Sequence, residues 1–305
     1  MLAENTTEIK RCKPLLGTYV ELTLRAHTKQ ASRKQLLKLS EHCFNAIKKV
    51  QGSMNFHDVN SELSLINRTA LTNTVVLSDP INQVLKLVEH LYHTSKGAFD
   101  PTVSHSSMYL DKFSKSTNSI SNAGDRHLNV ERFEDFGTWR DVSLNDNSIK
   151  FERPVAIDLG GVAKGFAVDQ ALACCPPEVD IIVNAGGDIG MSNWRNQNIG
   201  IRYSIDEVAE TKMLNRCVAS SADYFKKTSA IVDPVSRSVK KSHNCYSVFA
   251  KTCMIADALT KLAYLNKLPR NLANHYQATI CSINRFGTIK HSLPTRLFVP
   301  NVVEQ

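Results

Sequence analysis

Two features that other proteins use to bind zinc or to cross membranes are missing from this 305-residue sequence. Its eight cysteines are scattered and form no C-x-x-C pair, so the spacing typical of a zinc site is absent. No apolar run approaches the roughly 20 residues of a membrane-spanning helix, and residues 1–10 (MLAENTTEIK) contain no apolar stretch typical of a secretory signal. We therefore expect a cytoplasmic protein that does not insert into membranes, with reduced cysteines that pack as small hydrophobic residues.

A dense basic patch is also missing. The formal net charge is +8, but the densest basic runs are the pairs at 48–49, 226–227 and 240–241. Surfaces that bind nucleic acid are usually denser and interleaved with aromatic residues, so we expect no nucleic-acid partner. The charge is compatible with an anionic ligand such as a phosphate ester, although a solvated basic surface is the simpler explanation.

The hydrophobic pattern predicts helices and strands in irregular alternation. Helices are expected at about 31–50, 78–97, 163–175 and 253–265, where apolar residues recur at helical spacing. Strands are expected at 15–24, 155–157 and 179–183, and hairpins at 144–151 and 277–292. The polar, turn-rich segment 104–130 predicts a loop. The irregular order favours the α+β class over a doubly wound sheet.

The glycine-rich segment 158–165 (DLGGVAKG) follows an apolar strand and precedes a helix. Glycines let the backbone approach a ligand closely, and the free N–H groups at the start of a helix favour phosphate. Lys164 adds a positive charge, and Asp158 adds a hydrogen-bond acceptor. The segment matches neither the P-loop nor the dinucleotide-binding pattern. A phosphate-binding turn and a purely structural turn therefore remain equally open.

Two further segments, 184–189 (NAGGDI) and 97–103 (GAFDPTV), place an aspartate soon after a glycine. In the first, a Gly-Gly-Asp sequence at the end of a strand could border a ligand, but turn formation explains it better. In the second, Phe99 could stack on a ring and Asp100 could accept hydrogen bonds. The alternative for this second segment is the end of a helix followed by an Asp-Pro turn.

A carboxylate within an apolar helix is the fourth candidate feature. Asp257 lies in the segment 253–263 (CMIADALTKLA), where a charge is costly unless it is paired or bound to a metal. Thr260 and Lys261 lie one helical turn further on, so both can face Asp257. The set is compatible with a hard cation held by oxygens and equally with a plain ion pair between Asp257 and Lys261.

Eight short segments, taken in order, resemble the ApbE-type family of FAD:protein FMN transferases over nearly the whole chain. They are 16–18 (LGT), 56–64 (FHDVNSELS), 97–103 (GAFDPTV), 158–165 (DLGGVAKG), 184–188 (NAGGD), 220–224 (SSADY), 231–234 (IVDP) and 256–259 (ADAL). Each segment is a weak signal by itself, and their order makes the resemblance specific. The resemblance implies a single domain over residues 8–300 with an ApbE-like fold, in which mixed and antiparallel sheets and packed helices surround a nucleotide cleft.

The resemblance also implies a reaction and its ligands. FAD is the substrate, Mg²⁺ assists at its pyrophosphate, and FMN is moved to a threonine or serine hydroxyl of an acceptor protein with release of AMP. By position, the flavin contacts would be Leu16, Ala98, Phe99, Asp100, Asp158, Lys164 and Val232. The metal would be held at Gly161 through backbone oxygen, and by Asp257 and Thr260.

Among the positions that depart from the pattern of this family, two bear directly on the chemistry. Ala230 stands where the family often has a histidine that could act as a general base, and Lys261 stands where the family has a metal-binding threonine. A protonated lysine cannot ligate a cation, so Lys261 could contact a phosphate directly while Thr260 turns toward the metal. His243 is a candidate substitute base. Three functions remain open: an active transferase, which we favour; a FAD-binding relative that has lost transfer; and a FAD pyrophosphatase that releases FMN and AMP.

Overall fold

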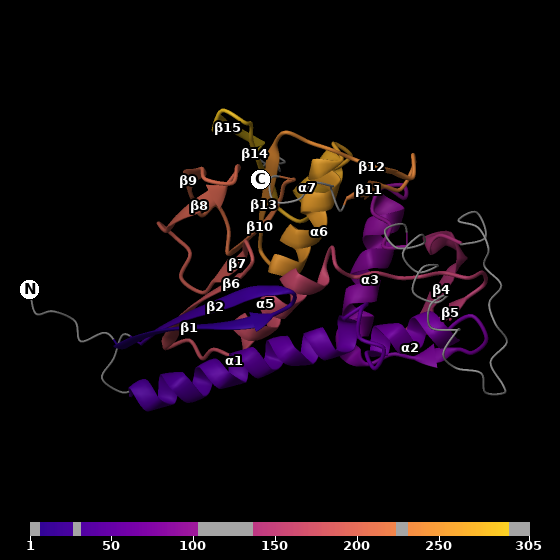
Figure 1. Cartoon of the computed structure of the whole chain (residues 1–305), viewed down its shortest axis with the longest axis horizontal. Coiled ribbons are helices and arrows are strands. Elements are labelled where there is room, and N and C mark those ends of the chain that lie inside the picture. The colour runs from indigo at the N-terminus through magenta and orange to yellow at the C-terminus, as the bar shows by residue number, and fades with distance from the viewer. Residues whose placement is uncertain (1–6, 27–31, 103–136, 224–230, 293–305) are drawn as a thin grey trace, which may run out of the picture.

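An antiparallel sheet of eight strands forms the centre of the computed structural model, which describes residues 7–26, 32–102, 137–223 and 231–292 (Figure 1). In spatial order the strands are β1 (Thr7–Leu15), β2 (Thr18–Ala26), β6 (Val179–Ala185), β7 (Asp188–Met191), β10 (Cys217–Ser221), β13 (Cys245–Ala250), β14 (Thr279–Ile283) and β15 (Ile289–Ser292). All neighbouring pairs are antiparallel. The pairing of β2 with β6 places Val20 opposite Ala185, so segments far apart in the sequence lie side by side in one sheet.

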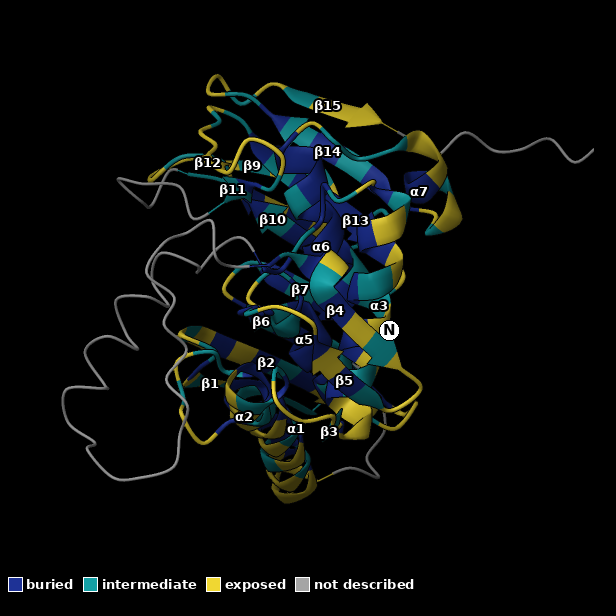
Figure 2. Cartoon of the chain, turned by 90° about the vertical axis from the view of Figure 1, so that its right-hand side faces the viewer, coloured by how far each residue is buried: buried dark blue, intermediate teal, exposed yellow. Residues whose placement is uncertain are grey.

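Helices cover one face of the sheet, and a hairpin covers part of the other. The helices α1 (Arg33–Met54), α5 (Ala163–Ala173) and α6 (Cys253–Tyr264) pack against the strands and against one another. Because side chains alternate along a strand, Ala219 and Val248 join the core under the helices. Their neighbours Val218 and Phe249 join a second core with residues of β8 (Asn198–Arg202), which pairs with β9 (Val208–Lys212). Figure 2 shows the buried residues concentrated in the central strands.

The remaining elements flank this body. They are α2 (Glu62–Thr69), β3 (Val75–Val76), α3 (Asp79–Thr94), the short 3-10 helix η2 (Trp139–Asp141), β4 (Val142–Asn145), β5 (Ser148–Phe151), β11 (Val232–Asp233), β12 (Ser238–Val239) and α7 (Arg270–His275). Within the described ranges, the structure contains no helix that combines the length and the apolar character needed to cross a membrane.

The predicted α+β class is confirmed, as are the four predicted helices and both hairpins. Ser78 is the N-cap residue of α3, but its hydroxyl donates to Glu62 Oε2 instead of capping the helix. Gly97 ends this helix with a φ of 80°, a conformation that favours glycine. The predicted loop at 104–130 lies outside the described residues.

Two predicted strands are wrong in part. The strand expected at 15–24 is instead a hairpin, because Leu16 (φ 57°) and Gly17 (φ 70°) form a turn of left-handed residues between β1 and β2. The strand expected at 155–157 joins no sheet. Its backbone is paired by a side chain: Asn67 donates from Nδ2 to the carbonyl of Ile157 at 2.9 Å and accepts from its N–H at 2.9 Å. A side chain thus replaces the neighbouring strand.

Candidate active site

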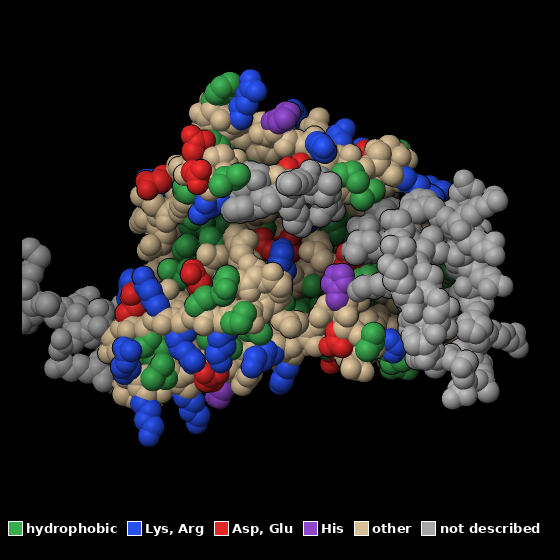
Figure 3. All heavy atoms as spheres, viewed as in Figure 1, with side chains coloured by type: hydrophobic (Ala, Val, Ile, Leu, Met, Phe, Trp, Pro, Cys, Tyr) green, Lys and Arg blue, Asp and Glu red, His purple; other side chains and the backbone are tan. Residues whose placement is uncertain are grey.

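Two lysines and two aspartates meet where α5, α6 and the β6–β7 turn converge. Lys164 Nζ lies 2.5 Å from Asp188 Oδ2 and 3.6 Å from Asp257 Oδ2, and Lys261 Nζ lies 2.5 Å from Asp257 Oδ1. We call Lys164, Asp188, Asp257 and Lys261 the charged cluster. Figure 3 shows charged side chains of both signs in a recess, in the part of the view where α5 and α6 meet in Figure 1. Their formal charges cancel.

The close approach of α5 to α6 builds this cluster. A Cβ on Gly165 would lie 2.3 Å from the carbonyl oxygen of Cys253, so only glycine allows the two helices to pack at this distance. The Gly165 N–H donates to Asp257 Oδ2 at 3.2 Å. One turn further along α5, Asp169 accepts from the backbone N–H groups of Cys253 and Met254 at 2.7 and 2.8 Å. α5 therefore holds the start of α6 and fixes where Asp257 lies.

Lys261 lies among the three residues predicted to hold the metal. Its Nζ donates to Asp257 Oδ1 at 2.5 Å, to the Asp257 carbonyl at 3.2 Å and to Thr260 Oγ1 at 3.1 Å. Its Cγ and Cε lie 3.5 Å from where a Cβ of Gly161 would be. The structure thus brings Gly161, Asp257 and Thr260 together, with the lysine side chain between them.

The hydroxyl of Thr260 is held by neighbours of its own. It donates to the Asp257 carbonyl at 2.7 Å and accepts from Ser221 Oγ, on β10, at 2.9 Å. Asp257 and Thr260 are fully buried. The oxygens of Asp257 and Thr260 therefore lie buried beside the Lys261 ammonium, and hydrogen bonds hold the Thr260 hydroxyl in place.

The electrostatics of the cluster follow from burial opposed by charge pairing. Burial acts against the charge on Asp257, but Lys164 and Lys261 hold the pKa of this carboxyl below its usual range. Burial also acts to lower the pKa of Lys164, and the carboxylates of Asp188 and Asp257 outweigh it and raise that pKa. Burial, with the nearby Asp257 carboxylate, raises the pKa of Asp188. Asp257 and Lys164 are therefore charged at neutral pH.

The three oxygens around Lys261 do not fit a resident divalent cation while the lysine is charged in this position. Mg²⁺ takes oxygen ligands, and here an ammonium already lies within hydrogen-bond distance of each of these oxygens. In the part of the chain that the structure describes, no group of three or more histidine, cysteine, aspartate or glutamate residues could hold a metal ion. Magnesium at this set stays a prediction, and it requires the Lys261 ammonium to leave these oxygens.

Several predicted flavin-contact residues lie on segments next to the charged cluster. The backbone N–H of Asp158 donates to the Pro101 carbonyl at 2.9 Å, which joins the glycine-rich segment to 97–103. Burial raises the pKa of Asp100, against two hydrogen bonds from Thr102. Ala98 and Phe99 are buried, so the ring of Phe99 belongs largely to the core. The bond between Asp158 and Pro101 places the two segments that carry the predicted aspartates side by side.

Leu16 belongs to the β1–β2 turn, which lies beside the turn that carries Asp188. A Cβ on Gly186 would lie 2.6 Å from Thr18 Oγ1, so the two turns touch. Leu16 N–H also donates to Gln51 Oε1 on α1 at 2.7 Å. The LGT and NAGGD segments, widely separated in the sequence, therefore border the same end of the sheet.

Val232 and His243 are not joined to the charged cluster by any hydrogen bond or ion pair of the described residues. Val232 lies on β11 and pairs with Val239 on β12. His243 is exposed in the loop before β13. This loop is tied to α6, because Asp223 Oδ2 accepts from the Ser242 N–H at 3.0 Å and from the hydroxyl of Tyr264. Ala230 lies outside the described residues.

Asp188 is the member of the cluster that the sequence interpretation missed. The NAGGD segment favoured a turn, and a turn is present, with Gly186 and Gly187 at φ 66° and 100°. The turn also delivers Asp188, at 2% exposure, to Lys164. The signal that could have identified it was its place among the ordered segments.

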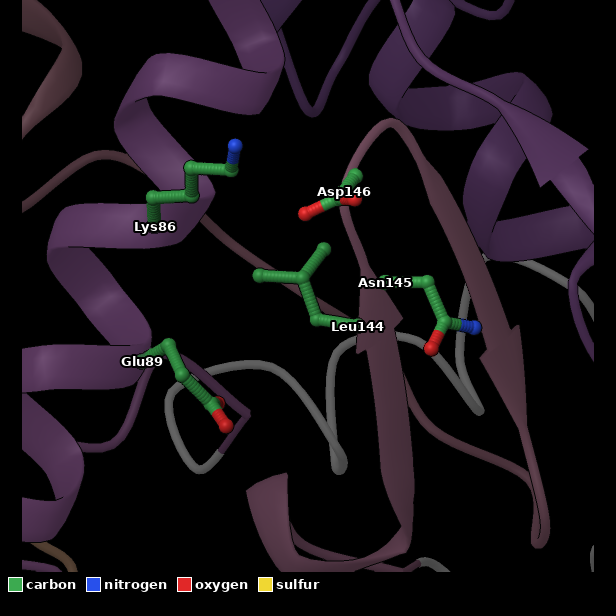
Figure 4. A pocket seen from close by; sticks show the side chains of 5 residues that line it. All are labelled: Lys86, Glu89, Leu144, Asn145 and Asp146. Carbon is green, nitrogen blue, oxygen red and sulfur yellow. The ribbon is translucent and has the colours of Figure 1, made fainter.

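A separate depression of about 410 Å³ lies between α3 and the β4–β5 hairpin. Figure 4 shows its lining, which is Lys86, Glu89, Leu144, Asn145 and Asp146. None of these residues belongs to the charged cluster or to the predicted flavin contacts. We therefore assign it no part in the candidate site.

Comparisons with known proteins point to one family. The model of the ApbE family matches residues 16–280. The chain is 29% identical over 227 residues to the FAD:protein FMN transferase of Chlamydia pneumoniae, a match that covers 70% of this chain and 64% of that protein. In fold it is similar to the ApbE protein of Thermotoga maritima (TM-score 0.74, 21% identity, 94% of this chain and 97% of the other). It is equally similar to the flavin transferase ApbE of Vibrio cholerae (TM-score 0.73, 20% identity, 95% and 98%).

Proposed function

Since the chain belongs to the ApbE family, we propose that it is a FAD:protein FMN transferase that moves FMN from FAD to a threonine or serine hydroxyl of an acceptor protein. One observation carries the proposal: Lys164, at the start of α5, and Lys261, on α6, both lie beside the buried carboxylate of Asp257. The two ammonium groups supply the positive charge that a diphosphate needs.

The proposed reaction conserves atoms and electrons. The acceptor oxygen attacks the phosphorus on the FMN side of the FAD diphosphate and forms a new P–O bond. The bond between that phosphorus and the bridging oxygen breaks, its electron pair leaves with AMP, and the hydroxyl proton passes to a base. Negative charge accumulates on the phosphate oxygens, so cations already in place lower the barrier most. Lys164 and Lys261 are 32% and 22% exposed, and can meet these oxygens.

The flavin contacts and the remaining predictions are part of the same proposal. Leu16, Ala98, Phe99, Asp100, Asp158 and Val232 would line the flavin side, and Lys164 the diphosphate. The hydrogen bond that joins segments 97–103 and 158–165 supports the contacts proposed for those segments. The pairing of Val232 with Val239 adds no support for a flavin contact of Val232. The single domain over 8–300 and the cytoplasmic location stay predictions.

The proposal is tested by following AMP and the mass of an acceptor. The full chain is incubated with FAD, Mg²⁺ and a threonine-containing peptide, with a peptide in which alanine replaces the threonine as control. We expect AMP and a peptide heavier by one FMN, only when the threonine is present. AMP without any acceptor would identify a pyrophosphatase. Tight FAD binding without AMP would identify a binding protein that has lost transfer.

The proposed role of His243 as general base has its own test. Replacing it, as His243→Gln, is expected to lower the transfer rate at saturating FAD about 100-fold, because a positioned base typically contributes 10²-fold or more. The affinity for FAD should not change. His291→Gln, also an exposed histidine, serves as the control and should retain full activity. An unchanged rate for His243→Gln would assign the proton to another group.

A further inference from the structure

We propose that the ammonium of Lys261 takes the place of a divalent cation, so that the chain handles the FAD diphosphate without a bound metal. The inference rests on the proposed function, since it takes FAD as the ligand. It concerns how the site supplies positive charge, which the family membership does not determine.

The first support is the position of Lys261 Nζ among three oxygens. They come from the Asp257 carboxylate, the Asp257 carbonyl and the Thr260 hydroxyl, at 2.5, 3.2 and 3.1 Å. An ammonium has three N–H donors and no acceptor, so these three oxygens match its donors before a diphosphate binds. A divalent ion would need the same oxygens and would be repelled by the ammonium beside it.

The second support is the balance of charge. The charged cluster contains two lysines and two aspartates, and each carboxylate accepts from a lysine at 2.5 Å. A divalent ion added to this cluster in the absence of FAD would leave two positive charges in a buried site without a partner, which is costly. With threonine in place of Lys261, the cluster would carry one net negative charge and an open set of oxygens.

The third support is accessibility. Asp257 is fully buried, whereas the side chains of Lys261 and Lys164 are 22% and 32% exposed. An incoming diphosphate therefore contacts the two ammonium groups, whereas the Asp257 carboxylate is shielded from it by burial. The Lys261 stem packs beside Gly161, because its Cγ and Cε lie 3.5 Å from where a Cβ of Gly161 would be, an ordinary contact distance.

The decisive measurement needs no variant. FAD affinity of the full chain is determined by fluorescence titration in EDTA and in excess Mg²⁺, and FMN transfer to the peptide is followed in both. We expect values that agree within about twofold. A loss of about tenfold or more in affinity in EDTA, equivalent to about 1.4 kcal/mol, with recovery in Mg²⁺, would overturn the inference.

Variants of Lys261 sharpen the test. Lys261→Thr is expected to bind FAD about tenfold more weakly in EDTA and to recover in Mg²⁺, because it opens the oxygens to a cation. Lys261→Met should bind FAD weakly under both conditions and bind riboflavin, which has no phosphate, as the parent chain does. Lys86→Met, on the exposed face of α3, is the control. Full FAD affinity of Lys261→Met in EDTA would contradict the proposal.

Failure of the inference and failure of the proposed function give different results. Transfer that takes place only with Mg²⁺ would overturn the inference and leave the transferase intact. If no acceptor is labelled under any condition, but FAD affinity depends on Lys261 and not on Mg²⁺, the transferase proposal fails and the inference stands for a FAD-binding protein.

Discussion

The variant Asp257→Asn is expected to lower the rate of FMN transfer by about 100-fold or more, a loss typical of a removed electrostatic group in an active site. The Asp257 carboxylate is the shared partner of Lys164, Lys261 and the Gly165 N–H. Asparagine keeps an acceptor for the N–H group but removes the charge. Lys164 then keeps only the Asp188 carboxylate, and Lys261 loses the carboxylate that holds its ammonium in place.

Measurements of the free energy of unfolding and of FAD binding separate this loss of transfer rate from unfolding of the variant. Breaking a buried ion pair costs about 3–5 kcal/mol. Because both lysines are partly exposed, we expect a smaller loss here, of about 2 kcal/mol. Asp206→Asn removes the same charge from an exposed position between β8 and β9. It should leave the transfer rate and the free energy of unfolding unchanged. A folded Asp257→Asn protein with the parent transfer rate would remove Asp257 from the candidate site.

The second large effect is expected from Gly165→Ala, which should destabilise the fold. The added Cβ would lie 2.3 Å from the Cys253 carbonyl oxygen and 2.8 Å from Met254 Cα, both of them backbone atoms that cannot turn aside. Alanine is favoured over glycine in a helix by about 1 kcal/mol, but forcing an atom this close to backbone costs about 3 kcal/mol, the upper end of the usual cost of overpacking. We expect a net loss of about 2 kcal/mol in the free energy of unfolding, and a melting temperature lower by about 3 °C.

Gly52→Ala provides the matched control for this prediction. Gly52 lies in α1, is exposed, and has no atom within 4 Å of where its Cβ would be. The same substitution should therefore raise stability by about 0.5–1 kcal/mol. Thermal unfolding of the three proteins measures both changes. FAD affinity should also fall in Gly165→Ala, because α5 carries both Lys164 and the N–H group that binds Asp257. A melting temperature of Gly165→Ala equal to that of Gly52→Ala would refute the close contact between α5 and α6.

The sequence could predict those elements whose signals are local. The helical spacing of apolar residues and Gly97 marked α3, and the Asp146 turn marked the β4–β5 hairpin. The pairing of Asp257 with Lys261 was also open to prediction, because residues four apart on a helix face each other. The order of eight short segments was enough to indicate the family, which the family model then matched over residues 16–280.

The tertiary structure decided what depends on contacts between distant segments. The chain turns after Leu15 because β1 and β2 pair with each other as an antiparallel hairpin. The extended segment at 155–157 is hydrogen-bonded by the side chain of Asn67 in place of a neighbouring strand. Asp188 became part of the site only because β6 and β7 carry its turn to Lys164.

The same distinction applies to the glycine-rich segment and to Lys261. The sequence by itself determined that residues 158–165 form a turn into a helix and that Lys261 can reach Asp257. It did not determine that Gly165 lets α5 touch α6, or that Gly161, Asp257 and Thr260 surround the lysine. Local patterns report which backbone shape a segment prefers. The partners of a buried charge depend on which elements the fold packs together, since a buried charge must find its counter-charge in the space around it.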